Sequence, residues 1–193
     1  MFAKTISAQE LNILPVKHFE GETFVIDDLK KLKEVLPLIS SEKLLGFDTE
    51  TRPNFKKGRT NHVALLQLAT RDKAFLFRIN KIGLPSVVTK ILADKNVLKV
   101  GAAIRDDIRT LKLASPFAPQ NFVELQDFVE YFDIESKGLS KLAAIVLNFR
   151  ISKSQQLSNW ENETLTAAQI NYAATDAWVG YEIFQKLKEL SEQ

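Results

Sequence analysis

Four acidic side chains occupy positions where carboxylates are uncommon. Asp48 and Glu50 come after the apolar residues of a predicted buried strand, and residues two apart on a strand point to the same side. Asp107 follows a strand-to-helix turn of small residues, and Asp176 lies on a helical face of small apolar residues. Neighbouring carboxylates repel one another unless a cation lies between them. The four acids together therefore favour a metal site.

Each of these motifs has a simpler explanation when it is taken alone. The predicted strand can end at Asp48, which would leave its two acids in solvent. Asp106 and Asp107 fall in the first turns of a predicted helix, where acidic residues offset the helix dipole. Tyr172 precedes Asp176 by four residues and shares its helix face, but this spacing is common. The joint occurrence of the motifs makes a metal site the better interpretation.

The composition restricts the chemistry further. The chain has 193 residues, a net charge of +2, no cysteine and two histidines. Disulfides, thiolate nucleophiles and cysteine-based zinc sites are therefore excluded, and a histidine-rich zinc site is implausible. The net charge neither indicates nor excludes a nucleic-acid partner. Without a signal peptide or an apolar run of membrane length, we expect a soluble, cytoplasmic protein with no membrane partner.

The elements that must position the acids follow a mixed order. Strands are predicted at residues 23–27, 43–51, 62–70, 73–79 and 97–103, of which 43–79 form an antiparallel meander. Helices are predicted at residues 29–39, 84–94, 104–114, 138–149 and 165–190, and residues 122–129 fit a short strand or the start of a helix. The last helix begins with a capping box of Thr166 and Gln169. This order predicts an α/β fold with a mixed sheet of five to six strands and helices on both faces.

The length of the chain fits one domain with a modest extension. Residues 1–20 are interpreted as an irregular N-terminal arm, and residues 21–193 as a single domain.

The order of the acids resembles that in one known enzyme family. Asp-x-Glu, a distant Asp after KVG and Tyr-x3-Asp resemble the three motifs of DEDDy 3′–5′ exonucleases. The segments DTETRP, VALLQLAT, KVGAAIRDD, LSNW and YAATDAW resemble the Werner-syndrome exonuclease branch, with ribonuclease D a more distant relative. The resemblance runs from about Phe24 to about Leu190. It implies a ribonuclease H-like fold and hydrolysis of phosphodiester bonds at nucleic-acid 3′ ends, with release of nucleoside 5′-monophosphates.

The resemblance also assigns roles to single residues. It implies two divalent cations, Mg²⁺ or Mn²⁺, bound by four acids: Asp48, Glu50, Asp107 and Asp176. Tyr172 takes the position that orients the attacking water, which suits a phenol because its pKa of about 10 makes it a poor base. The choice of Asp107 over Asp106 rests on the alignment. Many relatives have an asparagine where this chain has Ala102 and Ala103, a region in which the Werner branch tolerates small residues.

Binding of a nucleic-acid strand requires cations and stacking surfaces. The predicted contacts are Thr49, Arg52, Phe55, Lys56, Lys57, Leu66, Lys153 and Trp160. The lysines fit ordinary solubility equally well, and Trp160 fits a packing role better than a platform for a base. Leu66 is a core residue, although Leu66 or Gln67 could line the floor near the terminal base.

Two alternatives remain open at this point. A non-catalytic nucleic-acid-binding module of the same fold would typically have lost one acid, and all four are present. An RNA-specific trimming enzyme like ribonuclease D competes with a DNA exonuclease, because the contacts that recognise a 2′-hydroxyl cannot be read from the sequence. The partner is expected to be DNA or RNA with a free 3′ end, and a helicase or repair function would come from a separate protein.

Overall fold

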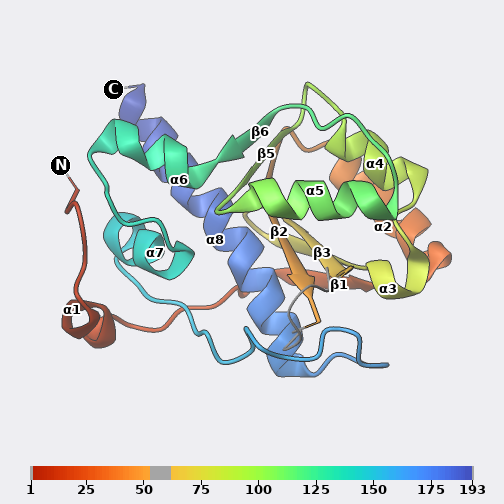
Figure 1. The fold of residues 1–193 in the computed structure, drawn as a ribbon, viewed down its shortest axis with the longest axis horizontal. Coiled ribbons are helices and arrows are strands. Elements are labelled where there is room, and N and C mark those ends of the chain that lie inside the picture. The colour runs from red at the N-terminus through yellow and green to blue at the C-terminus, as the bar shows by residue number, and fades with distance from the viewer. Residues whose placement is uncertain (1, 53–61, 193) are drawn as a thin grey trace.

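The structure is a computed structural model that describes residues 2–52 and 62–192 (Figure 1). Within these residues, six strands form one sheet in the order β1-β4-β3-β2-β5-β6. The strands are β1 (Glu22–Ile26), β2 (Leu44–Thr51), β3 (Val63–Ala69), β4 (Lys73–Arg78), β5 (Leu98–Gly101) and β6 (Phe122–Glu124). The mixed α/β sheet predicted from the sequence is confirmed.

The helices connect and cover these strands. They are α1 (Ala8–Ile13), α2 (Leu29–Ser40), α3 (Ile79–Ile82), α4 (Ser86–Leu92), α5 (Ile104–Ala114), α6 (Leu125–Phe128), the 3₁₀ helix η1 (Val129–Phe132), α7 (Leu139–Leu147) and α8 (Ala167–Ser191). The segment left undecided by the sequence contains both possibilities, because β6 leads directly into α6. The capping box of Thr166 and Gln169 at the start of α8 is confirmed.

The strand pairing places β2 at the centre of the sheet. The pairs β2–β3 and β3–β4 are antiparallel, which confirms the meander. The other neighbour of β2 is β5, which runs parallel to it. The parallel pairing of β1 with β4 was not predicted, since periodicity within a strand carries no information about its neighbour. A central strand has neighbours on both sides, and the polar residues at the end of β2, from Asp48 to Thr51, are half-buried.

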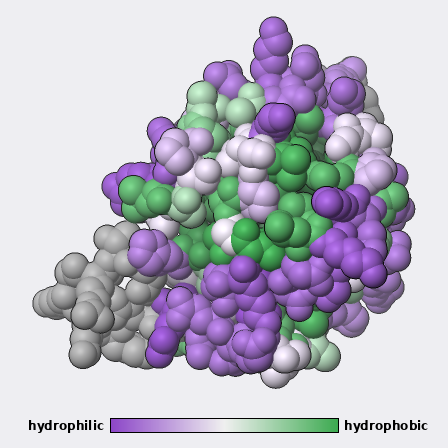
Figure 2. Space-filling view, turned by 90° about the vertical axis from the view of Figure 1, so that its right-hand side faces the viewer, coloured by the Kyte–Doolittle hydropathy of each residue, from purple (hydrophilic) through white to green (hydrophobic). Residues whose placement is uncertain are grey.

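Two layers of helices cover the two faces of the sheet. Helices α2, α4 and α5 pack on one face, against the phenylalanines of β4 and the leucines of β3. Figure 2 views the molecule from the side on which α2, α3 and α4 lie in Figure 1, and hydrophobic residues gather there in a central patch. Helix α8 crosses the opposite face and contacts β2 and β3. The acids on β2 and α8 are therefore brought together by this second layer.

Helix α8 lies very close to the sheet where it crosses β2. A Cβ atom added at Gly46 would lie 1.9 Å from the backbone oxygen of Ala177. A Cβ atom added at Gly180 would lie 3.3 Å from the backbone oxygen of Val100. Glycine at position 46 thus allows the backbones of β2 and α8 to approach one another, which no other residue would permit without a shift of the helix.

The N-terminal segment is more ordered than the sequence indicated. Helix α1 begins with a capping box of Ser7 and Glu10, which was not predicted from the sequence. Val16 then pairs in parallel with Arg150, and the backbone N–H of Phe19 donates to Thr175 Oγ1 on α8, at 3.0 Å. The division into an arm and a domain at residue 20 stays a prediction. Among the helices of the described residues, none combines the length and the apolar character required to cross a membrane.

Candidate active site

Three carboxylates meet where β2 passes under α8. Asp48 and Glu50 come from β2 and Asp176 from α8, and one carboxylate oxygen of each lies within 4.8 Å of the others. Strand β2 continues to Thr51, so the alternative in which the strand ends at Asp48 is wrong. Asp176 is 8% exposed, and its Oδ1 has no hydrogen-bond partner among the described residues. The arrangement is a cluster of carboxylates in which the buried Oδ1 of Asp176 lacks a donor among the described residues.

The fourth acid, Asp107, lies beside this cluster and is held by a threonine. Thr49 Oγ1 donates to Asp107 Oδ1 at 2.7 Å, and the backbone N–H of Thr49 donates to Asp48 Oδ1 at 2.9 Å. Asp106, by contrast, is exposed and forms an ion pair with Arg109 at 3.2 Å. Thr49 therefore joins the carboxylates of β2 and α5, which accords with the choice of Asp107 over Asp106.

The electrostatics of the cluster follow from burial and like charge. Burial, together with the negative charges of Asp176 and Glu50, raises the pKa of Asp48 well above its usual value. Burial raises the pKa of Glu50 to about 9, with a further contribution from the charge of Asp176. Burial also raises the pKa of Asp176 to about 7 and that of Asp107 to about 6. Bringing these groups together as carboxylates is costly without a compensating cation.

Helix α5, which carries Asp107, is oriented by a residue that the sequence analysis missed. Its N-cap residue, Ala103, has a left-handed backbone with φ of 63° and offers no side-chain cap. Glu124 supplies the cap instead, because its carboxylate accepts the backbone N–H groups of Ala103 and Ile104 at 2.7 and 2.8 Å. A carboxylate at a helix N-terminus is also favoured by the helix dipole. The sequence does show that α5 lacks a capping residue of its own, but this does not indicate that Glu124 accepts the free N–H groups at the start of the helix.

Tyr172 lies one turn before Asp176, as its spacing predicted. Burial and the neighbouring negative charges raise the pKa of its phenol above the ordinary value, so the hydroxyl keeps its proton. This hydroxyl acts as a hydrogen-bond donor toward Asp176 and opposes part of the rise in the pKa of that carboxyl. The ring of Trp160 packs against the Tyr172 ring, with 5.9 Å between ring centroids. Tyr172 is thus a fixed donor at the edge of the acid cluster.

The acids open into a cleft of about 320 Å³. Its walls include Tyr172, Lys153 and three polar residues that the sequence analysis did not single out: Ser140, Ser152 and Gln156. Lys153 is exposed at the mouth, and its charge lowers the pKa of Asp176. Serine and glutamine are common surface residues, so nothing in the sequence distinguished these three.

The predicted nucleic-acid contacts divide into three groups. Lys153 and Thr49 line the cleft, and Arg52 is exposed and forms an ion pair with Glu161 at 3.3 Å. The predictions for Phe55, Lys56 and Lys57 lie outside the described residues. Leu66 and Trp160 require a correction, because both are fully buried and offer no surface to a strand. Leu66 packs in the core on the face of the sheet opposite α8. Trp160 packs in the core as well, which is the role that the sequence favoured for it.

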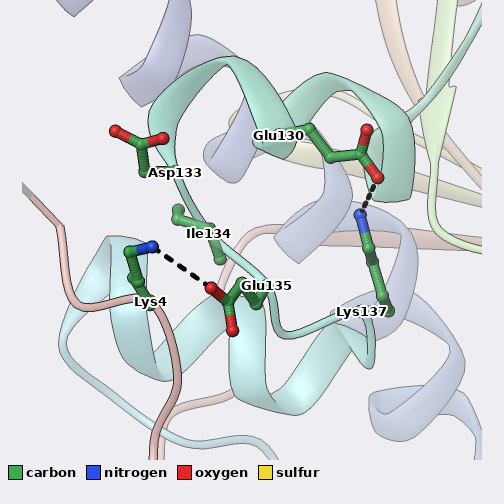
Figure 3. Close-up of a pocket in the computed structure, with 6 residues that line it drawn as sticks. All are labelled: Lys4, Glu130, Asp133, Ile134, Glu135 and Lys137. Carbon is green, nitrogen blue, oxygen red and sulfur yellow. Dashed lines mark hydrogen bonds and ion pairs between the residues drawn. The ribbon is translucent and has the colours of Figure 1, made fainter.

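A second hollow, of about 310 Å³, lies apart from the acids, between the N-terminal segment and the residues around η1 (Figure 3). Here four of the five charged side chains form two ion pairs. Lys4 Nζ lies 3.3 Å from Glu135 Oε1, and Lys137 Nζ lies 2.5 Å from Glu130 Oε1. Paired and exposed charges of this kind join segments of the chain, and within the part of the chain that the structure describes the acids suited to a metal ion are those of the cleft.

The geometry agrees with comparisons to known proteins. The sequence profile of the 3′–5′ exonuclease family matches residues 23–192. The bifunctional 3′–5′ exonuclease/ATP-dependent helicase WRN of Mus musculus is 33% identical over 195 residues, covering 93% of this chain and 14% of that protein. Exonuclease 3′–5′ domain-containing protein 2 of Drosophila melanogaster is 35% identical over 182 residues, covering 91% of this chain and 31% of that protein. The chain thus spans less than a third of the length of these two relatives.

Solved structures show the same fold. The Nibbler EXO domain of Aedes aegypti superposes with a TM-score of 0.79 at 26% identity, covering 92% of this chain and 93% of that one. RNase D of Escherichia coli superposes with a TM-score of 0.78 at 22% identity, covering 87% of this chain and 44% of that one. The ribonuclease H-like fold implied by the sequence is confirmed by these structures. The chain belongs to the DEDDy family of 3′–5′ exonucleases.

Proposed function

We propose that this chain removes nucleotides from the 3′ end of a nucleic-acid strand by hydrolysing phosphodiester bonds, with release of nucleoside 5′-monophosphates. The observation that carries the proposal is the cluster of Asp48, Glu50 and Asp176, whose oxygens lie within 4.8 Å of one another. Burial raises the pKa values of all three acids, and the neighbouring negative charges add to this for Asp48 and Glu50. A binding module would gain nothing from this arrangement, since it repels phosphate.

The acids suit a pair of hard divalent cations, Mg²⁺ or Mn²⁺. Asp48, Glu50 and Asp176 would hold one ion, and the orphaned Oδ1 of Asp176 is a free ligand atom for it. Asp107 and Asp48 would hold the other, because Thr49 donates hydrogen bonds to both carboxylates and so keeps them near one another. When bound, such ions provide a nucleophile at neutral pH and neutralise charge on the attacking and departing oxygens. No nitrogen or sulfur ligand is required for this chemistry.

Tyr172 positions the attacking water in this proposal. Its phenol keeps its proton and lies beside Asp176, so it can donate to one water without acting as a base. The Trp160 ring fixes the orientation of the phenol ring. Positioning of this kind converts binding energy into correct geometry for attack.

Positive charge at the mouth of the cleft would bind the phosphates of the strand. Lys153 lines the cleft. Arg52 directly follows β2 and contacts Glu161. Such contacts carry no sequence preference and make binding depend on salt. Whether the strand is DNA or RNA is decided by contacts to the sugar, so both are tested.

The direct test uses purified protein and 5′-labelled substrates. These are single-stranded DNA, duplex DNA with recessed or overhanging 3′ ends, and RNA, each with Mg²⁺, Mn²⁺ or EDTA. A ladder of one-nucleotide steps that EDTA suppresses is the expected result. Binding without cleavage of any substrate in both metals would contradict the proposal and favour a non-catalytic module. Cleavage of RNA alone would identify a trimming enzyme like ribonuclease D.

Two adjacent aspartates provide a matched control. Asp107→Ala removes the carboxylate held by Thr49 and is expected to abolish cleavage. Asp106→Ala removes an exposed carboxylate paired with Arg109 and is expected to leave cleavage unchanged. Equal activity of the two variants would contradict the assignment.

A further inference from the structure

Gln67 has an unusual environment for a glutamine. Its side chain is fully buried on β3, a strand whose other side chains are all apolar. Neither Nε2 nor Oε1 has a hydrogen-bond partner among the described residues. A buried amide without partners is destabilising, because it loses its bonds to water and gains none in return. A structural role in the core therefore does not account for this side chain.

The strand register places Gln67 beside the acid cluster. Gln67 is directly opposite Asp48 in the antiparallel pair of β2 and β3. Directly opposite residues project from the same face of a sheet, with Cβ atoms about 4.5–5.5 Å apart. Among the residues of β3, Gln67 is thus the one directly beside Asp48.

The packing of β3 confirms which face this is. Leu65, two residues before Gln67, packs with Tyr172 and Ala173 of α8. Ala69, two residues after it, packs with Ala174 and Ala177 of α8. Gln67 therefore lies between the sheet and α8, in the layer that contains Asp48 and Asp176.

We propose that Gln67 is a positioning residue for the metal site, and that its amide N–H groups orient the Asp48 carboxylate once cations occupy the cleft. The inference rests on the proposed function. A carboxylate that binds a cation through one oxygen is held in place when a neighbouring donor binds its other oxygen. The backbone N–H of Thr49 reaches only Asp48 Oδ1, and an amide donor on the adjacent strand suits the remaining acceptor capacity.

This role predicts opposite effects on stability and on metal binding. Gln67→Met replaces the amide with an apolar side chain of similar length. Because the amide has no hydrogen-bond partner among the described residues, its removal should leave the thermal unfolding temperature in EDTA unchanged or raise it. Affinity for Mn²⁺ should fall by about 10- to 100-fold, as it does when partners of metal ligands are removed. A merely structural role would lower the unfolding temperature in EDTA.

The experiment measures both quantities on the full chain. Free Mn²⁺ is followed by electron paramagnetic resonance during titration, and unfolding is followed by circular dichroism in EDTA. Leu76→Met is the matched control, because Leu76 is the residue opposite Gln67 on β4 and is equally buried. The control should bind Mn²⁺ like the wild type. Gln67→Leu, which removes the amide with a different shape, is measured in parallel.

The outcomes separate this inference from the proposed function. Wild-type Mn²⁺ affinity in both Gln67 variants, together with loss of binding in Asp48→Ala, would overturn only the role of Gln67. Unchanged Mn²⁺ affinity in Asp48→Ala would overturn the metal site itself. Failure of both Gln67 variants to fold would also overturn the inference, since it would mean that the amide has a structural partner.

Discussion

Two groups of charged side chains lie on this molecule in opposite electrostatic situations. In the hollow of Figure 3, Lys4 pairs with Glu135 and Lys137 with Glu130, and most of these side chains are largely exposed. In the cleft under α8, three carboxylates face one another, of which Asp176 is buried and Asp48 and Glu50 are half-buried. Paired surface charges contribute little to stability. Gathered buried carboxylates oppose folding, so their presence indicates a function that needs them.

The largest loss of activity is expected when one of the three clustered carboxylates is removed. Asp176→Asn keeps the shape of the side chain but removes a metal ligand charge. Metal ions contribute several kcal/mol to transition states of this kind, so we expect a loss of activity of roughly a thousandfold or more. The same variant should unfold at a higher temperature in EDTA, because it relieves repulsion. Rates within tenfold of the wild type would refute the role of Asp176.

The next largest effect comes from the approach of α8 to the sheet. In Gly46→Ala the new Cβ would lie 1.9 Å from the Ala177 oxygen, so the helix must move and carry Asp176 with it. Misplacement by about 1 Å can cost about a hundredfold in rate. Gly180→Ala is the graded control, because its nearest atom lies at 3.3 Å and demands a smaller shift. Rates and unfolding temperatures measured together should rank Gly46→Ala as the more severe.

Removal of the phenol hydroxyl should weaken the reaction without abolishing it. Hydrogen bonds to charged groups contribute about 1.5–3 kcal/mol, so Tyr172→Phe is expected to reduce the turnover number by roughly 10- to 100-fold. The Phe ring still packs against Trp160, and the unfolding temperature should change little. Activity equal to the wild type would show that another group orients the water.

The acid cluster should also reverse the usual dependence of stability on pH. Glu50, Asp176 and Asp107 have pKa values of about 9, 7 and 6 in the folded protein. Their ordinary values are 4.5 for Glu and 3.8 for Asp, so the folded state keeps protons that the unfolded state releases. The free energy of unfolding in EDTA should therefore fall as the pH rises from about 4.5 toward 9.

Urea unfolding in EDTA across this pH range measures the effect. Glu50→Gln is the control, because it removes the carboxyl with the highest pKa of these three and should flatten the curve at its alkaline end. Saturating Mg²⁺ should reduce the slope, since the cations take the place of the protons. Stability in EDTA that rises over the same range would contradict the raised pKa values.

The smallest effect on stability and activity is expected for the ion pair between Lys4 and Glu135, in the hollow of Figure 3. Lys4→Ala breaks an ion pair whose side chains are 66% and 62% exposed. The free energy of unfolding should fall by less than about 1 kcal/mol, and exonuclease activity should not change. A loss of activity in this variant would show that the N-terminal segment acts on the cleft, and would weaken the contrast between the two charged groups.

Much of the site could be predicted because its motifs are local. Asp48 and Glu50 share a side through strand periodicity, and Tyr172 and Asp176 share one through helical periodicity. The meander and the start of α8 were also readable, since turns and capping boxes depend on a few adjacent residues. The sequence already favoured core positions for Leu66 and Trp160, and their full burial removes the alternative contact with a strand.

The sequence by itself determined the acid motifs, the element order and, through resemblance, the family. Only the tertiary structure decided that Thr49 holds Asp107 while Asp106 remains in solvent. It alone placed Glu124 at the start of α5 and Gln67 beside Asp48. The physical reason is that these relationships join residues from different strands and helices. Spacing fixes the face on which a side chain lies, whereas its partner is fixed by the packing of the sheet against α5 and α8.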